Sequence, residues 1–489
     1  MGNRWDNALL RKVAEDAAGD PAVLQVNPSG ELLVDAAAET PIRETEGDTV
    51  TGPILQTIAG RTEAGTVLAA KIGDDRKMRV RTSFDRDHED AYGRLRVGRP
   101  WASFDSFLDE AVNMASWETI TTGTGAYAAN ANRPSGTLST TAAADSVIRE
   151  QHGYNHTPPG RGSFVVLSTV LGAGQADVTK RVGLFNTADG FFFEQDGTGG
   201  LYVVRRTSTS GSPVDTRVAQ ASWNMDVMDG SGASGVTLDP AMIQSLVIES
   251  QWMGSGILLF GVIVGQEPIY VHEFEYTNLT TEEYTSSPAL PVRYEITQGG
   301  ATAGSLVQVA AAVSSEAGAE IEGVRGSASR GTSAKTLPGG ARQSLLSIRL
   351  RATVESGRVN RRIVIPTGIS VLSDKQLLLE IVVQHSNEAT PTFGGTPTWT
   401  SAGTYSGVES APDVTTVGAG NIPFQTYMDA GSKNDSRSAA VDVSALLKPS
   451  NYLSMDSAGT GSDYLHVVAT NLEAQSALIL AALTWQEIT

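Results

Sequence analysis

The sequence of 489 residues contains no cysteine. This excludes a secreted scaffold held by disulfides, a zinc site with cysteine ligands and a thiol enzyme. Long hydrophobic runs are also missing: the most apolar stretch, residues 256–264, is interrupted by glycine and too short to cross a bilayer, so no membrane insertion is expected. Residues 1–20 carry charges and lack the apolar core of a signal peptide, which predicts synthesis in the cytoplasm without export.

Basic residues are scarce relative to acidic ones. The chain has 36 lysines and arginines against 54 aspartates and glutamates, a formal net charge of −18. A nucleic-acid-binding protein needs a basic face to neutralise phosphates, so no nucleic-acid partner is expected. The same charge disfavours adhesion to anionic lipid and favours solubility at high concentration.

The abundant features indicate an all-β protein. Hydrophobic residues make up 40% of the chain, enough for real cores, and 51 glycines indicate many turns, whereas long stretches of helical periodicity are scarce. Residues 180–206 are typical: runs of β-branched and aromatic residues alternate with turns rich in glycine and aspartate. Similar short runs recur about every ten residues, the spacing of an antiparallel sandwich. The predicted strands of the first half are residues 117–120, 146–149, 163–171, 182–185, 191–195, 201–205, 245–252, 257–264, 268–274, 292–296 and 305–313.

The chain is too long for a single core, and its composition changes along its length. We predict two antiparallel β-sandwich domains of jelly-roll-like type, preceded by an extended N-terminal arm. The arm, residues 1–85, would contain a short amphipathic helix at residues 4–18 and extended segments that dock on another subunit, with a flexible arm as the alternative. The first sandwich would span residues 86–315, a loop or linker residues 316–343, and the second sandwich residues 344–489, with strands at 344–350, 362–365, 377–383, 463–468 and 477–480.

Two motifs invite comparison with catalytic sites. A zinc-protease helix would require a second histidine four residues after His272, but Tyr276 stands there and the segment is strand-like, so His272 is predicted to satisfy a hydrogen bond at a sheet edge. Glu273 and Glu275 lie on one face of a strand, with Glu249 on a neighbouring one, whereas a glycosidase needs two carboxylates facing each other across the sugar. We predict a solvated strand face there, and keep a hydrolase as an alternative.

Candidate ligand sites are few. Asp226, Asp229 and Asp239 form a loose acidic loop without the spacing of a calcium loop, so turns are predicted. No catalytic residue, cofactor site or metal site is predicted. The stretch of residues 386–436 is rich in Thr, Ser, Gly and Pro with isolated aromatics, a composition typical of binding loops. The candidate surface-binding residues are Trp399, Tyr405, Phe424 and Tyr427.

A set of motifs, in order along the chain from residue 90 onward, resembles a family of tailed-bacteriophage virion structural proteins. The arm before residue 90 is not covered, and residues 252–256 (WMGSG) depart slightly from the pattern Trp-Leu-Gly-x-Gly. The matching segments are residues 90–97 (DAYGRLRV), 104–106 (FDS), 181–185, 190–194, 201–206, 235–239, Trp252, 271–274 and 290–296 (LPVRYEI), with weaker matches at 345–350, Trp399 and 406–409.

The resemblance implies a particle component without catalytic residues. We expect a tail fibre or tail-associated adhesion protein that assembles as a homo-oligomer, with a trimer predicted. It would attach to other virion proteins through the arm. Its location would be the virion, and the loops of residues 386–436 would contact a host cell-surface glycan. The alternatives are a decoration or head-fibre protein on the capsid, a polysaccharide-degrading tail spike, and a carbohydrate-binding module in which Trp399 and Tyr405 stack on sugars.

Overall fold

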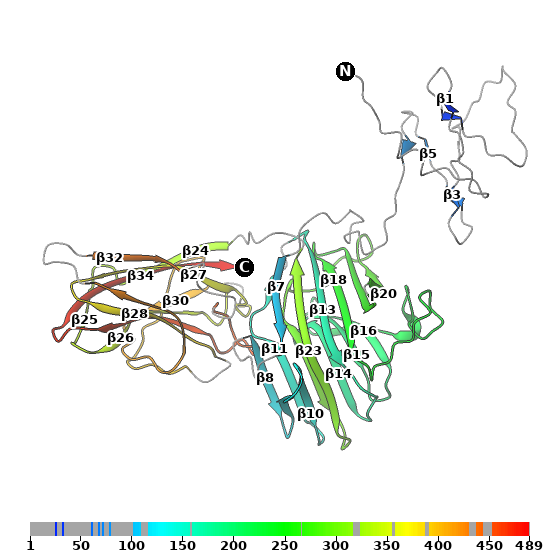
Figure 1. Ribbon diagram of the computed structural model, residues 1–489, viewed down its shortest axis with the longest axis horizontal. Coiled ribbons are helices and arrows are strands. Elements are labelled where there is room, and N and C mark those ends of the chain that lie inside the picture. Colours follow the sequence, from blue (N-terminus) through cyan, green and yellow to red (C-terminus); the bar gives the residue numbers. More distant parts are fainter. Residues whose placement is uncertain are drawn as a thin grey trace, which may run out of the picture. The chain divides into compact units, whose positions relative to one another are not determined.

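The computed structural model describes nearly all of the chain from residue 101 onward and six two-residue strands before it (Figure 1). The chain divides into two units, Met1–Ser83 and Phe84–Thr489. The first unit contains three antiparallel pairs of strands. The short helix predicted in the arm and the motif at residues 90–97 lie outside the described residues. The described ranges are 101–108, 116–156, 159–265, 267–315, 323–354, 357–386, 391–429, 437–443 and 452–488, and the early strands are β1 (Gln25–Val26), β2 (Leu32–Leu33), β3 (Gly60–Arg61), β4 (Val67–Leu68), β5 (Lys71–Ile72) and β6 (Met78–Arg79).

Two antiparallel sheets form the first sandwich. The eight-stranded sheet has the order β20-β19-β18-β13-β23-β10-β9, and β7 also pairs with β23. The seven-stranded sheet has the order β17-β16-β15-β14-β22-β11-β8. Their strands are β7 (Trp101–Phe107), β8 (Trp117–Thr122), β9 (Ala126–Ala129), β10 (Gly136–Thr140), β11 (Ser146–Gln151), β13 (Gly162–Val170), β14 (Val178–Phe185), β15 (Gly190–Gln195), β16 (Leu201–Thr207), β17 (Val214–Ala219), β18 (Gln244–Gln251), β19 (Ile257–Val264), β20 (Glu267–Glu275), β22 (Val292–Gln298) and β23 (Gly304–Ser315); β12 (Asn155–His156) pairs with β21 (Ala289–Leu290) beside them.

The core of this sandwich is built from alternate residues of both sheets. Val182 and Phe193 of the seven-stranded sheet pack in one cluster with Val165 and Phe260 of the eight-stranded sheet. The rings of Phe193 and Phe260 meet edge to face, 5.3 Å apart. Successive side chains of a strand point to opposite faces, so period-two hydrophobicity is the physical basis of this packing.

The second sandwich also consists of two antiparallel sheets around a single core. The five-stranded sheet has the order β24-β34-β27-β32, with β25 also paired with β34, and the six-stranded sheet has the order β29-β30-β26-β33-β28-β31. Fully buried Trp485 of the first packs in one cluster with Leu379 and Leu465 of the second. The strands are β24 (Gly323–Ser329), β25 (Lys335–Leu337), β26 (Arg342–Leu350), β27 (Ile363–Ser373), β28 (Leu377–Gln384), β29 (Thr400–Ser401), β30 (Val408–Ala411), β31 (Asn421–Met428), β32 (Arg437–Asp442), β33 (Tyr464–Asn471) and β34 (Ala477–Ile488).

The prediction of an all-β chain with two antiparallel sandwiches is confirmed. Every strand predicted in the two domains overlaps an observed strand. The expectation of a loop or linker at residues 316–343 is wrong for two parts of it, because β24 and β25 lie there and pair with β34. That segment has few large apolar side chains, so its strands form by backbone pairing to an edge. Within the part of the chain that the structure describes, no helix has the length and apolar character of a membrane span.

Candidate functional site

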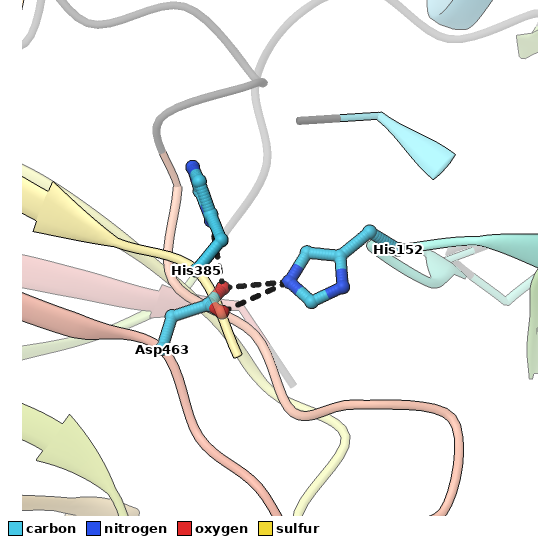
Figure 2. Close-up of side chains that lie close together, drawn as sticks. All are labelled: His152, His385 and Asp463. Carbon is cyan, nitrogen blue, oxygen red and sulfur yellow. Dashed lines mark hydrogen bonds and ion pairs between the residues drawn. The ribbon is translucent and has the colours of Figure 1, made fainter. Parts of the chain in front are cut away.

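The site that stands out is the joint at which the two sandwiches meet. Three buried side chains from strand ends converge there (Figure 2). His152 follows β11, His385 follows β28, and Asp463 precedes β33. The pairing of β28 with β33 continues up to Gln384 and Tyr464, which brings the next residues, His385 and Asp463, opposite each other. Nε2 of His152 lies 2.8 Å from Oδ2 and 3.0 Å from Oδ1 of Asp463.

The Asp463 carboxylate is 0% exposed and held by hydrogen bonds. The backbone N–H groups of Ser386 and Ser454 donate to its two oxygens, each at 2.9 Å. Burial by itself would raise the pKa of Asp463, but the charge and hydrogen bond of His152, with His385, hold it well below its usual range. For His152, burial lowers the pKa, but the charge and hydrogen bond of Asp463 together with the charges of Glu118 and Asp456 outweigh burial, so the pKa is raised overall. This His152–Asp463 contact is therefore a buried ion pair at the joint.

A second group of contacts surrounds Arg361 of the second sandwich. Its guanidinium lies 4.3 Å from the ring centre of Tyr154 in the first sandwich and donates to the carbonyls of Asp456 (2.5 Å) and Ser457 (2.7 Å). Nε2–H of His156 donates to the Arg361 carbonyl at 3.0 Å. Burial lowers the pKa of His156 to about 4, so the ring is neutral at neutral pH. The His156 ring of the first sandwich thus finds its partner in the second, whereas the Arg361 guanidinium bonds within its own sandwich and stacks on a ring of the first.

Two further hydrogen bonds cross the joint, which also contains a cavity. The Ser457 N–H donates to Glu118 at 2.9 Å, and Arg358 donates to the Ser286 carbonyl at 2.7 Å. The cavity has a volume of about 330 Å³ and is mainly apolar. Residues of both sandwiches line it, including Phe104, His152, Ile363, Ser454 and Ile488.

An ion-pair ladder crosses the seven-stranded sheet on the face turned away from the core. It runs in the order Glu150, Arg293, Glu295, Arg181, Glu194, Arg217 through strands β11, β22, β14, β15 and β17, with nitrogen–oxygen distances of 3.0, 2.5, 2.7, 2.7 and 2.5 Å. Of the five members from Glu150 to Glu194, four are buried and Arg181 is partly exposed. The guanidiniums of Arg181 and Arg293 also lie over the rings of Phe192 and Phe185. Each charge of the ladder has an opposite partner, so the ladder functions as scaffold.

The four aromatic residues predicted as a binding surface do not converge. Trp399 is half-buried on the six-stranded sheet, 5.6 Å from the Tyr464 ring and 4.4 Å from the Arg349 guanidinium. Phe424 packs against the core of the second sandwich. Tyr405 is 74% exposed in the loop between β29 and β30, at one edge of that sheet, and Tyr427 is 76% exposed on β31 at the other. The two exposed tyrosines therefore lie at opposite edges of the sheet and do not form one binding surface.

The motifs compared with catalytic sites are mostly structural. His272 lies on the edge strand β20 and accepts the Asn224 N–H at Nδ1, 3.2 Å away, as predicted. Glu275 is exposed, but Glu273 is buried, so the prediction of a solvated face is wrong for Glu273. The carboxylate of Glu249 is 2.5 Å from the Tyr270 hydroxyl, which donates to it.

The acidic loop forms turns, as predicted. Asp226 accepts the N–H groups of Met228 and Ser234, and Asp229 and Asp239 each accept the N–H two residues ahead.

The convergence of His152, His385 and Asp463 was not predicted. His152 and Asp463 are 311 residues apart in the chain, so no local spacing could indicate their contact. The only signal in the sequence is indirect: each lies next to a predicted strand, where polar residues of different strands can meet.

Comparisons with known proteins assign no family. No protein-family model and no curated protein matches the chain. Among solved structures, a glycoside hydrolase family protein from Mycobacterium thermorestibile is similar at 12% identity and a TM-score of 0.32, covering 43% of this chain and 99% of that one. A carbohydrate-binding (CBM2) module of the evolved Dit of Lactobacillus casei BL23 phage J-1 is similar at 9% identity and a TM-score of 0.31, covering 46% and 99%. A galectin from Caenorhabditis elegans has 18% identity and a TM-score of 0.20, covering 36% and 94%. Likeness at this level assigns neither a function nor a site.

Proposed function

We propose that the chain is a structural component of a tailed-bacteriophage particle, a tail fibre or tail-associated attachment protein that acts by assembly rather than catalysis. The motifs that resemble phage virion proteins provide the first support. Their order along the chain is more specific than any single motif.

The observation that carries the proposal is the role of the motif residues in the fold. Arg181 and Glu194 of two motifs, and Arg293 and Glu295 of a third, are members of the ion-pair ladder. Most of the hydrophobic motif residues are buried in the core or under the ladder, including Val182, Leu184, Phe185, Phe191, Phe192, Phe193, Val203, Val204, Val271, Val292, Tyr294 and Ile296. A motif used for packing and internal charge pairing supports a structural role, since a catalytic motif would place reactive groups in a pocket.

The joint supports a mechanical role. An attachment protein has to transmit force between its domains, and polar contacts that neither sandwich satisfies alone favour one fixed arrangement. We extend the proposal to the partners: the arm binds other virion proteins, and copies of the chain assemble with each other. Exposed Tyr405 and Tyr427 remain the candidates for contact with a host-surface glycan.

The experiment is electron microscopy of purified phage particles labelled with an antibody against residues 101–489. Label along the tail or at its tip is expected. Label confined to the capsid would support the head-fibre alternative and contradict a tail position. In parallel, purified protein incubated with host capsule should release no reducing ends. Release that is lost in Glu273→Gln would instead support a polysaccharide-degrading spike.

A further inference from the structure

We propose that His152, His385 and Asp463 bind one divalent transition-metal ion of the zinc class, which clamps the two sandwiches together. This site is independent of whether the chain belongs to a phage particle. Two imidazoles and one carboxylate are a donor set typical of zinc, whereas calcium and magnesium prefer oxygen ligands throughout. The three residues come from both sandwiches, so a bound ion would cross the joint.

The distances between the donor atoms fit such an ion. One donor atom of each residue lies within 4.8 Å of the others. Nδ1 of His385 is 3.4 Å from Oδ2 of Asp463, and Nε2 of His152 is 2.8 Å from the same oxygen. Tetrahedral zinc with bonds of about 2.0–2.1 Å separates its ligands by about 3.3 Å. The His152–Asp463 contact has to widen by about half an ångström, and the donor nitrogens of His152 and His385, which lie within 4.8 Å of each other, have to settle at the tetrahedral separation.

The independent observation is an unsatisfied buried imidazole. His385 is 1% exposed, and neither of its ring nitrogens has a hydrogen-bond partner. Nδ1 is in ion-pair contact with the Asp463 carboxylate but has no hydrogen bond, and Figure 2 shows the close approach of the three side chains. A buried ring nitrogen without a hydrogen bond costs free energy, and a metal bond to Nδ1 would recover that cost at Nδ1.

The surroundings already orient the carboxylate. The N–H groups and hydroxyls of Ser386 and Ser454 donate to the two oxygens of Asp463 and orient the carboxylate. A metal ion would take the position now bonded to Nε2 of His152. On binding, the ion replaces the proton between Nε2 of His152 and Asp463, and that proton leaves to solvent. The cavity beside His152 and Ser454 is large enough for a water molecule as fourth ligand.

The test uses the full chain, stripped with a chelator and titrated with Zn²⁺ alone by calorimetry, with metal content measured after dialysis. We expect one Zn²⁺ per chain, a higher melting temperature with Zn²⁺, and affinity weakened at least about 100-fold in His385→Gln. His466→Asn is the matched control, since it changes another buried histidine of the same sandwich and should bind like the wild type.

A second readout does not depend on any variant. Co²⁺ added to the stripped wild-type chain should give the intense visible absorption of a tetrahedral site, and Zn²⁺ should abolish it. The proposal is overturned if the wild-type chain retains no stoichiometric Zn²⁺, if His385→Gln binds as tightly as the wild type, or if Co²⁺ shows only the weak absorption of a hydrated ion.

Discussion

The guanidinium of Arg361 lies 4.3 Å from the ring centre of Tyr154, and each residue belongs to a different sandwich. The Tyr154 ring is buried, so the contact forms only when the two sandwiches are joined. The same guanidinium fixes the loop that holds Asp456 and Ser457. Arg361 is therefore the residue through which the joint can be weakened with a single substitution.

Arg361→Ala should reduce the free energy of unfolding by about 2–4 kcal/mol, because it removes a cation–π contact and two charge-assisted hydrogen bonds. Urea denaturation measures the loss. Arg325→Ala, which removes an exposed arginine from β24, is the control and should change stability by less than about 0.5 kcal/mol. If both substitutions reduce the free energy of unfolding equally, the contacts of Arg361 at the joint contribute nothing to stability.

The ion-pair ladder should be sensitive to the loss of one charge. Arg293→Met leaves the buried carboxylates of Glu150 and Glu295 with fewer counter-charges and should cost about 3–5 kcal/mol. Arg206→Met removes the more exposed pair with Asp215 and should cost less than about 1 kcal/mol. Thermal and urea unfolding of both variants tests the difference. A loss below about 1 kcal/mol in Arg293→Met would contradict the scaffold role.

His466 should make the second sandwich sensitive to acid. Burial, together with the charge of Arg342, lowers the pKa of His466 to about 3 from an ordinary value of 6.5. The unfolded chain then binds a proton between pH 6.5 and 3 that the folded chain does not. Stability is fully present above pH 6.5 and falls as the pH decreases, by about 3 kcal/mol at pH 4.

His466→Asn removes this titration and keeps a polar group beside Ser347, whose hydroxyl lies 2.7 Å from Nδ1 of His466. The stability of the variant relative to the wild type should therefore increase by about 3 kcal/mol between pH 7 and pH 4. Chemical denaturation at both pH values measures this. If the stability difference between the variant and the wild type is the same at both pH values, His466 is protonated in the folded state at pH 4.

The sequence predicted the large strands but not the small ones or the joint. Strands such as β14 and β15 have enough β-branched and aromatic residues to be recognised locally. Strand β24 (GVRGSAS) has too few such residues to be recognised from its sequence. It is stabilised by pairing with β34 rather than by its own side chains. The His152–Asp463 pair depends on tertiary packing across 311 residues, and a single sequence contains no measure of that contact.

The proposed glycan contact has a local test. Tyr427 is exposed on an edge strand, so Tyr427→Ala should leave unfolding stability within about 0.5 kcal/mol of the wild type. Adsorption of phage particles carrying the variant to host cells should decrease. Trp399→Ala is the contrasting variant, since Trp399 packs on Arg349 and Tyr464 and its loss should lower stability by about 1–2 kcal/mol. Normal adsorption with Tyr427→Ala would exclude this tyrosine from the host contact.

The proposed structural role is tested most directly by quantitative mass spectrometry of gradient-purified particles of the proposed parent phage. A structural component should be present in a fixed ratio to the major capsid protein, and that ratio should survive repeated purification in high salt. A chain found in the infected-cell lysate but absent from the particles would contradict the proposed role, whatever the stability of its two sandwiches.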